Sequence, residues 1–271
     1  MLKACRLELV GETGRMSRYW LILLAGLICS GPITAEEADN LARIHVEAIG
    51  GKMRLNSLNS LQVSGHVLID QRTLLFTLLA ERPNRFRMET WASDHVIVQA
   101  TDGVNPPWQM DPNATPLKPK LLTGDESREF AADSEFDDPL VDYAERGYTL
   151  DFAGTDKLNG REMYRLLVTR RHLVSYYLFL DAETYFIAAK RSVRRLEFGR
   201  EINLETIYED FRPVGGIIMP HHFTVTAEGK LLHETFLNKV ETNVPVPQDS
   251  FTMPVIDRQN DFLRVERHAL P

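Results

Sequence analysis

The sequence predicts a mainly β protein in which one long antiparallel sheet curls into a barrel or a part of one. Three observations carry this prediction. Apolar and polar residues alternate between residues 61 and 70, which is the period of a strand with one buried face. About a dozen such runs follow, up to residue 241. Short turns with hairpin chemistry, such as Asn159-Gly160 and Glu228-Gly229, separate many of them.

The first predicted element is a helix over residues 36–50, ahead of the strands. Its apolar residues recur at helical spacing, and Gly50-Gly51 supplies the left-handed conformation that ends a helix. The strands that follow in the first half are predicted at residues 61–69, 73–82, 85–92, 94–101 and 105–110. Pro106 and Pro107 make the last of these an edge strand or a broken one.

A helical insert is predicted between the two halves, at residues 123–147. A turn or two of helix covers residues 126–132. A second helix begins at Asp138, an N-cap residue followed by Pro139, and ends at Gly147. The remaining strands are predicted at residues 148–154, 161–169, 173–180, 184–195, 201–211, 217–227 and 231–241. Both helical parts must lay their apolar stripes on the sheet.

The chain has 271 residues, of which 44% are hydrophobic and 25% charged, so it can bury a core. Its formal net charge of −7 argues against a nucleic-acid partner, which requires clustered positive charge. The only cysteines are Cys5 and Cys29, so a disulfide framework and a thiolate zinc site are excluded from the rest of the chain.

The first 35 residues have the pattern of a signal peptide. The apolar run at residues 20–28 follows two arginines and is shorter than a membrane-spanning helix. We expect cleavage before Glu36, with Met16 as an alternative start; the other interpretation is an uncleaved membrane anchor. Ile28 precedes Cys29 where a lipoprotein signal requires a small residue, which argues against lipidation. The mature chain is then an exported single domain, residues 36–271.

Charge is unevenly distributed along the chain. Residues 125–145 hold nine acidic residues and one basic residue, whereas residues 161–200 hold nine basic and four acidic residues. These segments are either solvated faces or patches that orient a partner or a lipid head group. The predicted strands enclose more space than two or three short helices can fill. The concave side of the sheet is therefore either a solid core or a cavity for an apolar ligand.

Catalytic motifs are not found in the sequence. His221 and His222 are adjacent in a predicted strand, so their side chains point to opposite faces and cannot hold one ion. The other histidines are scattered, and neither a nucleophile elbow nor a glycine-rich phosphate loop occurs. We therefore predict no catalytic residue, no metal, no cofactor and no enzymatic activity.

Several short motifs resemble one known family. Residues 79–88 contain Arg82-Pro83-Asn84 followed by Phe86, and Asp102-Gly103, Trp108 and Asp111-Pro112 come later. This order resembles the LolA-type periplasmic lipoprotein carriers. His45-x-x-Ala48-x-Gly50-Gly51, residues 58–65, residues 180–184 and residues 208–220 are similar to a longer branch described as outer-membrane lipoprotein-sorting proteins.

The resemblance implies an antiparallel unclosed β-barrel, a LolA-like half-barrel, with an N-terminal helix and a helical insert acting as a lid. It also implies a soluble periplasmic carrier that hides lipoprotein acyl chains, or another lipid, in a hydrophobic cavity and delivers them to the outer membrane. An inner-membrane donor, an outer-membrane acceptor and transient membrane contact are the implied partners. The alternative is a lipid-sensing regulatory or scaffold module of the same fold that docks onto a membrane protein.

The resemblance also suggests site residues. Arg82 matches the arginine that ties the barrel to its lid, although it could simply end a strand at a surface turn. Nine residues are predicted to line the cavity, and each of them also fits a plain core position: Val63, Val67, Phe76, Phe86, Met88, Val96, Val98, Trp108 and Leu140. A strand phase wrong by one residue would turn such a residue to the other face.

Overall fold

A computed structural model describes residues 33–92, 95–113, 118–170, 173–195 and 200–254. The chain divides into two units, residues 1–33 and residues 34–271. All described residues except Ile33 belong to the second unit. Apart from its last three residues, the predicted signal peptide, with Met16 and Cys29, lies outside the described residues.

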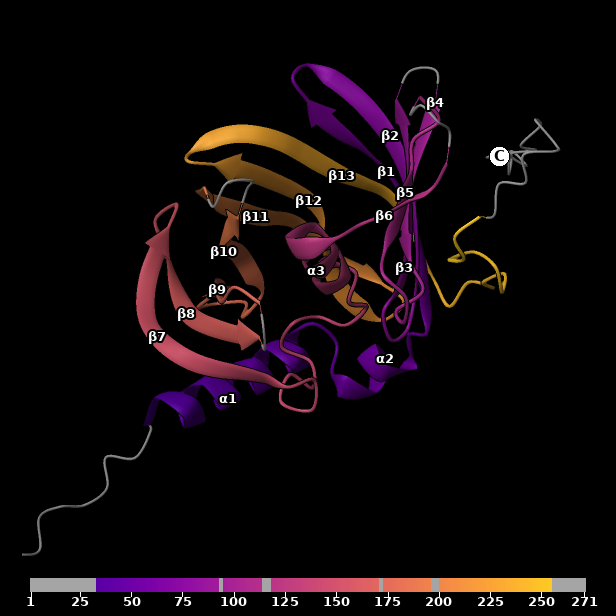
Figure 1. The fold of residues 1–271 in the computed structure, drawn as a ribbon. Helices are drawn as coiled ribbons and strands as arrows, with labels where there is room; N and C mark the ends of the chain where they lie inside the picture. Colours follow the sequence, from indigo (N-terminus) through magenta and orange to yellow (C-terminus); the bar gives the residue numbers. More distant parts are fainter. Residues whose placement is uncertain (1–32, 93–94, 114–117, 171–172, 196–199, 255–271) are drawn as a thin grey trace, which may run out of the picture. The chain divides into compact units, whose positions relative to one another are not determined.

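The described residues form one sheet of 13 strands, and the sheet curves around a helix on its concave side (Figure 1). The strands of the first half are β1 (Ser60–Ile69), β2 (Arg72–Glu81), β3 (Arg85–Ala92), β4 (His95–Thr101), β5 (Trp108–Met110) and β6 (Lys120–Leu121). Those of the second half are β7 (Tyr148–Leu158), β8 (Arg161–Arg170), β9 (Tyr176–Asp181), β10 (Ile187–Arg195), β11 (Glu201–Val214), β12 (Ile217–Ala227) and β13 (Lys230–Thr242).

The strand order is β6-β5-β4-β3-β2-β1-β13-β12-β11-β10-β9-β8-β7, and neighbouring strands are antiparallel. The pairing of β1 with β13 joins the two halves, so β6 and β7 remain as the edges of an unclosed sheet within the described residues. The predicted antiparallel half-barrel is therefore confirmed.

Hairpin turns account for much of the agreement between predicted and observed strands. Asn159-Gly160, Gly215-Gly216 and Glu228-Gly229 each have positive φ at both residues. This is the backbone conformation of a type I′ turn, whose twist matches that of the strands it joins. The strand predicted at residues 105–110 is shorter, because β5 begins at Trp108, and it is not an edge, because the unpredicted β6 pairs with it.

Helix α1 (Ile33–Ala48) packs on the concave side of β7–β10, where Ala38, Leu41 and Ala42 join the main core cluster. The six-residue helix α2 (Lys52–Ser57) was not predicted. Between the two helices Gly50 has φ 131°, and a Cβ there would lie 2.8 Å from the Gly216 carbonyl oxygen. Glycine thus allows the chain after α1 to approach the β11–β12 turn, where the Ile218 amide donates to the Ile49 carbonyl.

The insert contains α3 (Gly124–Asp133), which agrees with the helix predicted at residues 126–132. The second predicted helix, from Asp138 to Gly147, is wrong: residues 139–147 form successive turns. Asp138 does accept a hydrogen bond from the Leu140 amide, as a cap would. Asp142, however, has φ 46°, a left-handed conformation that a continuous right-handed helix cannot contain.

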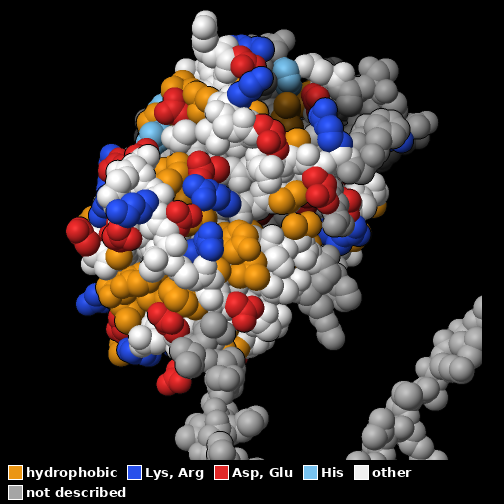
Figure 2. Space-filling model, turned by 90° about the vertical axis from the view of Figure 1, so that its left-hand side faces the viewer, with side chains coloured by type: hydrophobic (Ala, Val, Ile, Leu, Met, Phe, Trp, Pro, Cys, Tyr) orange, Lys and Arg blue, Asp and Glu red, His pale blue; other side chains and the backbone are white. Residues whose placement is uncertain are grey.

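Part of the uneven charge is neutralised by ion pairs between the acidic and the basic segment. The acidic helix α3 lies against the basic strand β10, where Glu129 pairs with Arg194 at 3.1 Å and Asp133 with Lys190 at 3.7 Å. On the outer face, Arg191 lies 2.5 Å from Glu205. Acidic and basic side chains accordingly lie side by side on the face shown in Figure 2.

Candidate functional site: a pocket between the sheet and the insert

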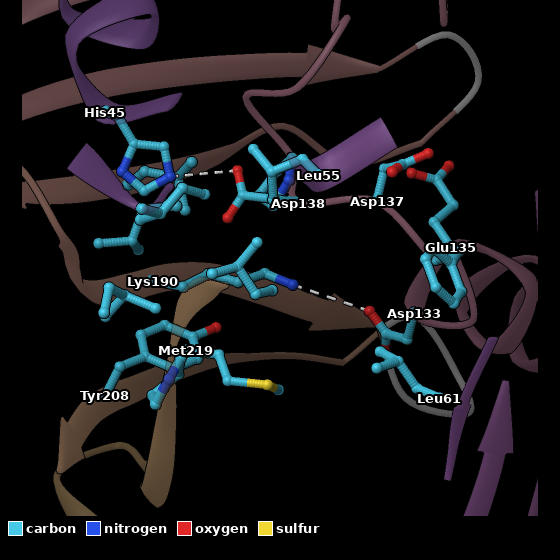
Figure 3. Close-up of a pocket in the computed structure, with 18 of the residues that line it drawn as sticks. His45, Leu55, Leu61, Asp133, Glu135, Asp137, Asp138, Lys190, Tyr208 and Met219 are labelled. Atoms are coloured by element: carbon cyan, nitrogen blue, oxygen red, sulfur yellow. Dashed lines mark ion pairs between the residues drawn. The ribbon is translucent and has the colours of Figure 1, made fainter. Parts of the chain in front are cut away.

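The pocket lies where the concave face of the sheet meets the residues that follow α3 (Figure 3). Its volume is about 350 Å³, toward the lower end of the roughly 300–1,000 Å³ typical of small-molecule sites. Helices α1 and α2, strands β8–β12 and the insert contribute lining residues, and Leu61 and Arg82 line it at β1 and the end of β2.

One wall of the pocket is apolar. The second half of the sheet supplies most of it, and the chain around α2 adds the rest. The apolar residues of this wall are Ile49, Leu55, Leu58, Leu61, Leu178, Ile187, Phe211, Ile217, Ile218, Met219, Pro220 and Phe223. Such a surface suits hydrocarbon, because apolar area removed from water contributes roughly 25 cal/mol per Å².

The opposite wall is acidic and comes from the insert. Its carboxylates are Asp133, Glu135, Asp137 and Asp138, and Ala132, Phe136, Pro139 and Arg146 of the same segment also line the pocket. Each of these carboxylates faces a basic side chain of the pocket. The pairs are Asp133–Lys190, Glu135–Arg146, Asp137–Arg82 and Asp138–His45.

Arg82 joins the end of β2 to α2 and to the insert. Its Nε and Nη2 atoms donate to the carbonyl oxygens of Leu58 and Leu55, at 3.0 and 2.9 Å. Its Nη1 atom lies 2.5 Å from Asp137, and its guanidinium lies over the Phe136 ring. The fork of donors therefore bridges α2 and the insert. This contact geometry is that expected of a latch; the latch role itself stays a prediction.

His45 and Asp138 join α1 to the insert. His45 is 2% exposed; its Nε2 atom lies 3.3 Å from Asp138, and its Nδ1 atom lies 2.7 Å from the carbonyl oxygen of Tyr185. Burial alone would lower the pKa of His45, but the Asp138 carboxylate outweighs it and the pKa is raised. Burial alone would raise the pKa of Asp138. His45, the Leu140 amide and Arg146 together outweigh burial, so the pKa of Asp138 is lowered. Nδ1 lies within hydrogen-bond distance of its acceptor, whereas the contact of Nε2 with Asp138 is an ion pair without hydrogen-bond geometry. A carboxylate beside one ring nitrogen and a carbonyl beside the other favour the imidazolium.

Two cations lie against one aromatic ring at the other end of the pocket. The Nζ atom of Lys190 and the Cζ atom of Arg170 lie 4.8 and 5.0 Å from the centroid of the Tyr176 ring. Burial, with the nearby Arg170 and Arg194, lowers the pKa of Lys190, although Asp133 acts against the shift. Burial also raises the pKa of Tyr176 and of Tyr208, so these phenols are neutral.

The nine predicted cavity residues do not line this pocket. Val63, Val67, Phe76 and Met88 belong to a separate cluster on the first half of the sheet. Phe86 packs against Phe130 of α3 with ring centroids 5.7 Å apart. These five residues share the concave face. Leu78 pairs with both Val63 and Met88, which places those two on one face. Phe76 pairs with Gly65 of the same strand face, and Phe86 lies two residues before Met88, so both follow.

Val96, Val98 and Trp108 lie on the opposite, convex face. Val98 pairs with Glu89, which alternates with the concave Met88, and Ala100 pairs with Trp108. Trp108 donates to the carbonyl oxygen of Phe251 at 3.1 Å, so the chain after β13 covers this face. Leu140 is buried in the core between α1 and β7–β10. Contact of the nine residues with a ligand stays a prediction.

Sequence reasoning missed the pocket residues of the second half of the sheet. The available signal was a lysine directly after an apolar run: Lys190 follows Ile187, Ala188 and Ala189. A second signal was His45, a titratable residue in the predicted first helix and part of the motif that resembles the lipoprotein-sorting proteins.

Within the described residues, clusters of three or more histidine, cysteine or acidic side chains suited to a metal ion are not found. The described helices also include none that combines the length and the apolar character needed to span a membrane.

The fold resembles several solved structures. A Vibrio parahaemolyticus domain assigned to outer membrane lipoprotein sorting aligns with a TM-score of 0.56 and 12% identity over 80% of this chain and 97% of its own. A DUF1329 family protein from Desulfovibrio piger aligns with a TM-score of 0.56 and 11% identity over 80% and 97%. A LolA superfamily protein from Nitrosomonas europaea aligns with a TM-score of 0.52 and 12% identity over 81% of this chain and 98% of its own.

No protein-family model matches the chain, and no curated protein does so. Together, the unclosed sheet and the solved structures define the class: this chain has a LolA-like fold.

Proposed function

We propose that this protein is a periplasmic carrier that binds lipoprotein acyl chains or another lipid in its concave pocket and delivers them toward the outer membrane. The observation that carries the proposal is the pocket itself, with an apolar wall from β11 and β12 beneath an insert that Arg82 holds in place. The similarity in fold to a domain assigned to outer membrane lipoprotein sorting supports it.

The physical reason for such a carrier is the cost of exposing hydrocarbon to water, about 0.8 kcal/mol for each CH₂ group. A pocket that shelters the chain removes this cost during transfer. Opening of the insert as a lid would admit and release the chain without a cofactor. The ion pairs of Asp137 with Arg82 and of Asp138 with His45 are among the contacts that such opening would break.

In this proposal the protein is a binding protein and not an enzyme. The leader of residues 1–35 directs export, and the partners are an inner-membrane donor and an outer-membrane acceptor, with transient contact to each membrane.

The experiment is native mass spectrometry of the protein purified from a bacterial periplasm. We expect a bound lipid or lipoprotein fragment, whose loss on extraction returns the protein to its apo mass. A pocket-filling variant, Met219→Trp, provides the matched control and should carry less ligand. Wild-type protein that is consistently empty, and that fails to take up added lipid, would contradict the proposal.

A second candidate is a lipid-sensing or scaffold module that docks onto a membrane protein. The observation that favours it is the apolar tip of the β12–β13 hairpin, where Leu231 and Leu232 are 59% and 41% exposed. If this candidate is right, Leu231→Ser with Leu232→Ser will abolish docking to the membrane protein in a crosslinking experiment and leave lipid uptake unchanged.

A further inference from the structure

The charged residues that line the pocket do not balance. Its four carboxylates are each paired with one basic side chain: Asp133 with Lys190, Glu135 with Arg146, Asp137 with Arg82 and Asp138 with His45. The fifth basic residue of the lining is Arg170. Arg170 is therefore the one basic residue of the described lining without a carboxylate partner.

Arg170 has few partners of its own. Its Nε atom is buried and makes no hydrogen bond, and its guanidinium lies over the Tyr176 ring, 5.0 Å from the centroid. Among the residues that the structure describes, no carboxylate lies within ion-pair distance of Arg170. Withdrawing a guanidinium donor such as this Nε–H from water without a partner is costly.

Lys190 is close to the same ring and only loosely held by its acid. Its Nζ atom lies 4.8 Å from the Tyr176 centroid and 3.7 Å from Asp133, whose side chain is 55% exposed. Burial is the main cause that lowers the pKa of Lys190; Asp133 opposes the shift, and Arg170 and Arg194 add to it. Because Arg170 and Lys190 both lie against the Tyr176 ring, these two like charges repel one another. An anion placed between them would relieve this repulsion and supply acceptors to Arg170.

The apolar part of the pocket begins beside these cations. Pocket residues occur from β10, which carries Lys190, to β1, which carries Leu61, and β11, β12 and β13 lie between them in the sheet. Four strand spacings correspond to roughly 19 Å along the sheet. Phe211 and Phe223 lie in this stretch, so a chain that starts at the cations would continue over apolar surface.

We infer that the pocket binds an amphiphile with an anionic head group, a carboxylate or a phosphate, which pairs with Arg170 and Lys190 while its hydrocarbon chain crosses β11 and β12. This inference rests on the proposed lipid-binding function and narrows its two proposed ligands, lipoprotein acyl chains or another lipid, to the second. An acyl chain in ester or amide linkage carries no charge at its head, so the two cations select a free acid or a phosphate-bearing lipid.

The test compares the binding of palmitate, hexadecyl phosphate and methyl palmitate, which share the same C16 chain length. Each competes with a polarity-sensitive fluorescent probe on wild-type protein and on Arg170→Gln. We expect wild type to prefer at least one anionic ligand over the ester, and Arg170→Gln to lose about 10- to 100-fold in affinity for it. Affinity for methyl palmitate should not change. Preference between palmitate and hexadecyl phosphate identifies the head group.

Arg165→Gln is the matched control. Arg165 lies on the same strand, β8, but contacts the Ala153 carbonyl oxygen and the Tyr177 ring outside the pocket. The Arg165→Gln substitution removes the same charge as Arg170→Gln and should leave the affinities for palmitate, hexadecyl phosphate and methyl palmitate unchanged. Lys190→Gln is a second pocket variant, with the same selective loss expected should Arg170→Gln not fold.

The outcomes separate the two proposals. Equal binding of anionic and neutral ligands by wild type, or an equal loss of all three in the pocket variants, would overturn the anionic site and leave the lipid carrier standing. Wild-type protein that binds none of the three ligands would overturn both.

Discussion

Arg82 and Asp137 form an ion pair, 2.5 Å long, between the end of β2 and the insert, and their side chains are 25% and 18% exposed. The same guanidinium donates to the carbonyl oxygens of Leu55 and Leu58. One side chain thus joins the sheet, α2 and the insert. Any opening of the insert away from the sheet must separate Arg82 from Asp137.

Arg82→Leu should change ligand release more than stability. The variant loses the ion pair and both hydrogen bonds, and a cost of about 1–3 kcal/mol in the free energy of unfolding is expected. Release of a bound fluorescent lipid should accelerate several-fold, because the closed insert is stabilised less. Stopped-flow transfer to acceptor vesicles measures this rate, and urea denaturation measures the stability.

Arg85→Leu is the control for Arg82. It removes the same charge from the same hairpin, but Arg85 contacts Glu81 and the Phe251 ring instead of the insert. Asp137→Asn removes only the ionic partner and should give an intermediate rate. If Arg82→Leu releases lipid at the wild-type rate, Arg82 is not a latch.

The His45–Asp138 pair predicts a defined pH dependence of stability. His45 has a pKa raised above its ordinary value of 6.5, so its contribution is complete below pH 6.5 and is lost as the pH rises through the folded-state pKa. Asp138 has a pKa lowered from 3.8, so its contribution is present above pH 3.8 and is lost as the pH falls through its folded-state pKa. The pair therefore stabilises most between these limits.

The measurement is the free energy of unfolding in urea at pH 6 and pH 8.5. We expect the stability of wild type to exceed that of His45→Gln by more at pH 6 than at pH 8.5. Gln keeps a donor for the Tyr185 carbonyl oxygen but cannot carry the charge. His66→Gln, at a histidine bonded to Asn238 on the convex face, should show no such difference. A gap between wild type and His45→Gln that is constant with pH would refute the charged pair.

Much of the strand layout is predictable from sequence because two local signals agree. Alternation of apolar residues marks the strands, and dipeptides such as Asn159-Gly160 mark the type I′ turns. The helix predicted from Asp138 failed at Asp142. There the left-handed backbone is part of a turn region that Arg146 fastens by bonding the Asp138 and Val141 carbonyl oxygens.

The face of a strand is harder to predict than its position. Strand β4 has apolar residues on both faces, Val96 and Val98 on one and Ile97 on the other, so its alternation does not distinguish concave from convex. The decisive contact is with the chain around Phe251, about 150 residues further on. The pocket is equally non-local, because Lys190 and His45 meet the insert only after the sheet has curved.

The C-terminal contact on the convex face can be tested directly. Phe251 is 1% exposed, and its carbonyl oxygen accepts from the Trp108 indole. Phe251→Ala should lower the free energy of unfolding by about 3–5 kcal/mol, because a large buried ring is lost. Lipid binding per folded molecule should stay unchanged, since this face is opposite the pocket. Met253→Ala, at a residue 39% exposed, is the control and should cost far less.

The position of the hydrocarbon chain on the concave face is the last prediction. Met219 lines the pocket, whereas Met88 lies on the same face within the cluster of Val63, Val67 and Phe76. Met219→Trp should fill part of the pocket volume of about 350 Å³ and weaken palmitate binding at least about tenfold. Met88→Trp should leave binding unchanged, although overpacking there costs about 1–3 kcal/mol in stability. Titration of the fluorescent probe on both variants decides between the two locations. A loss of binding in Met88→Trp alone would move the chain to the cluster expected from the sequence and away from the pocket.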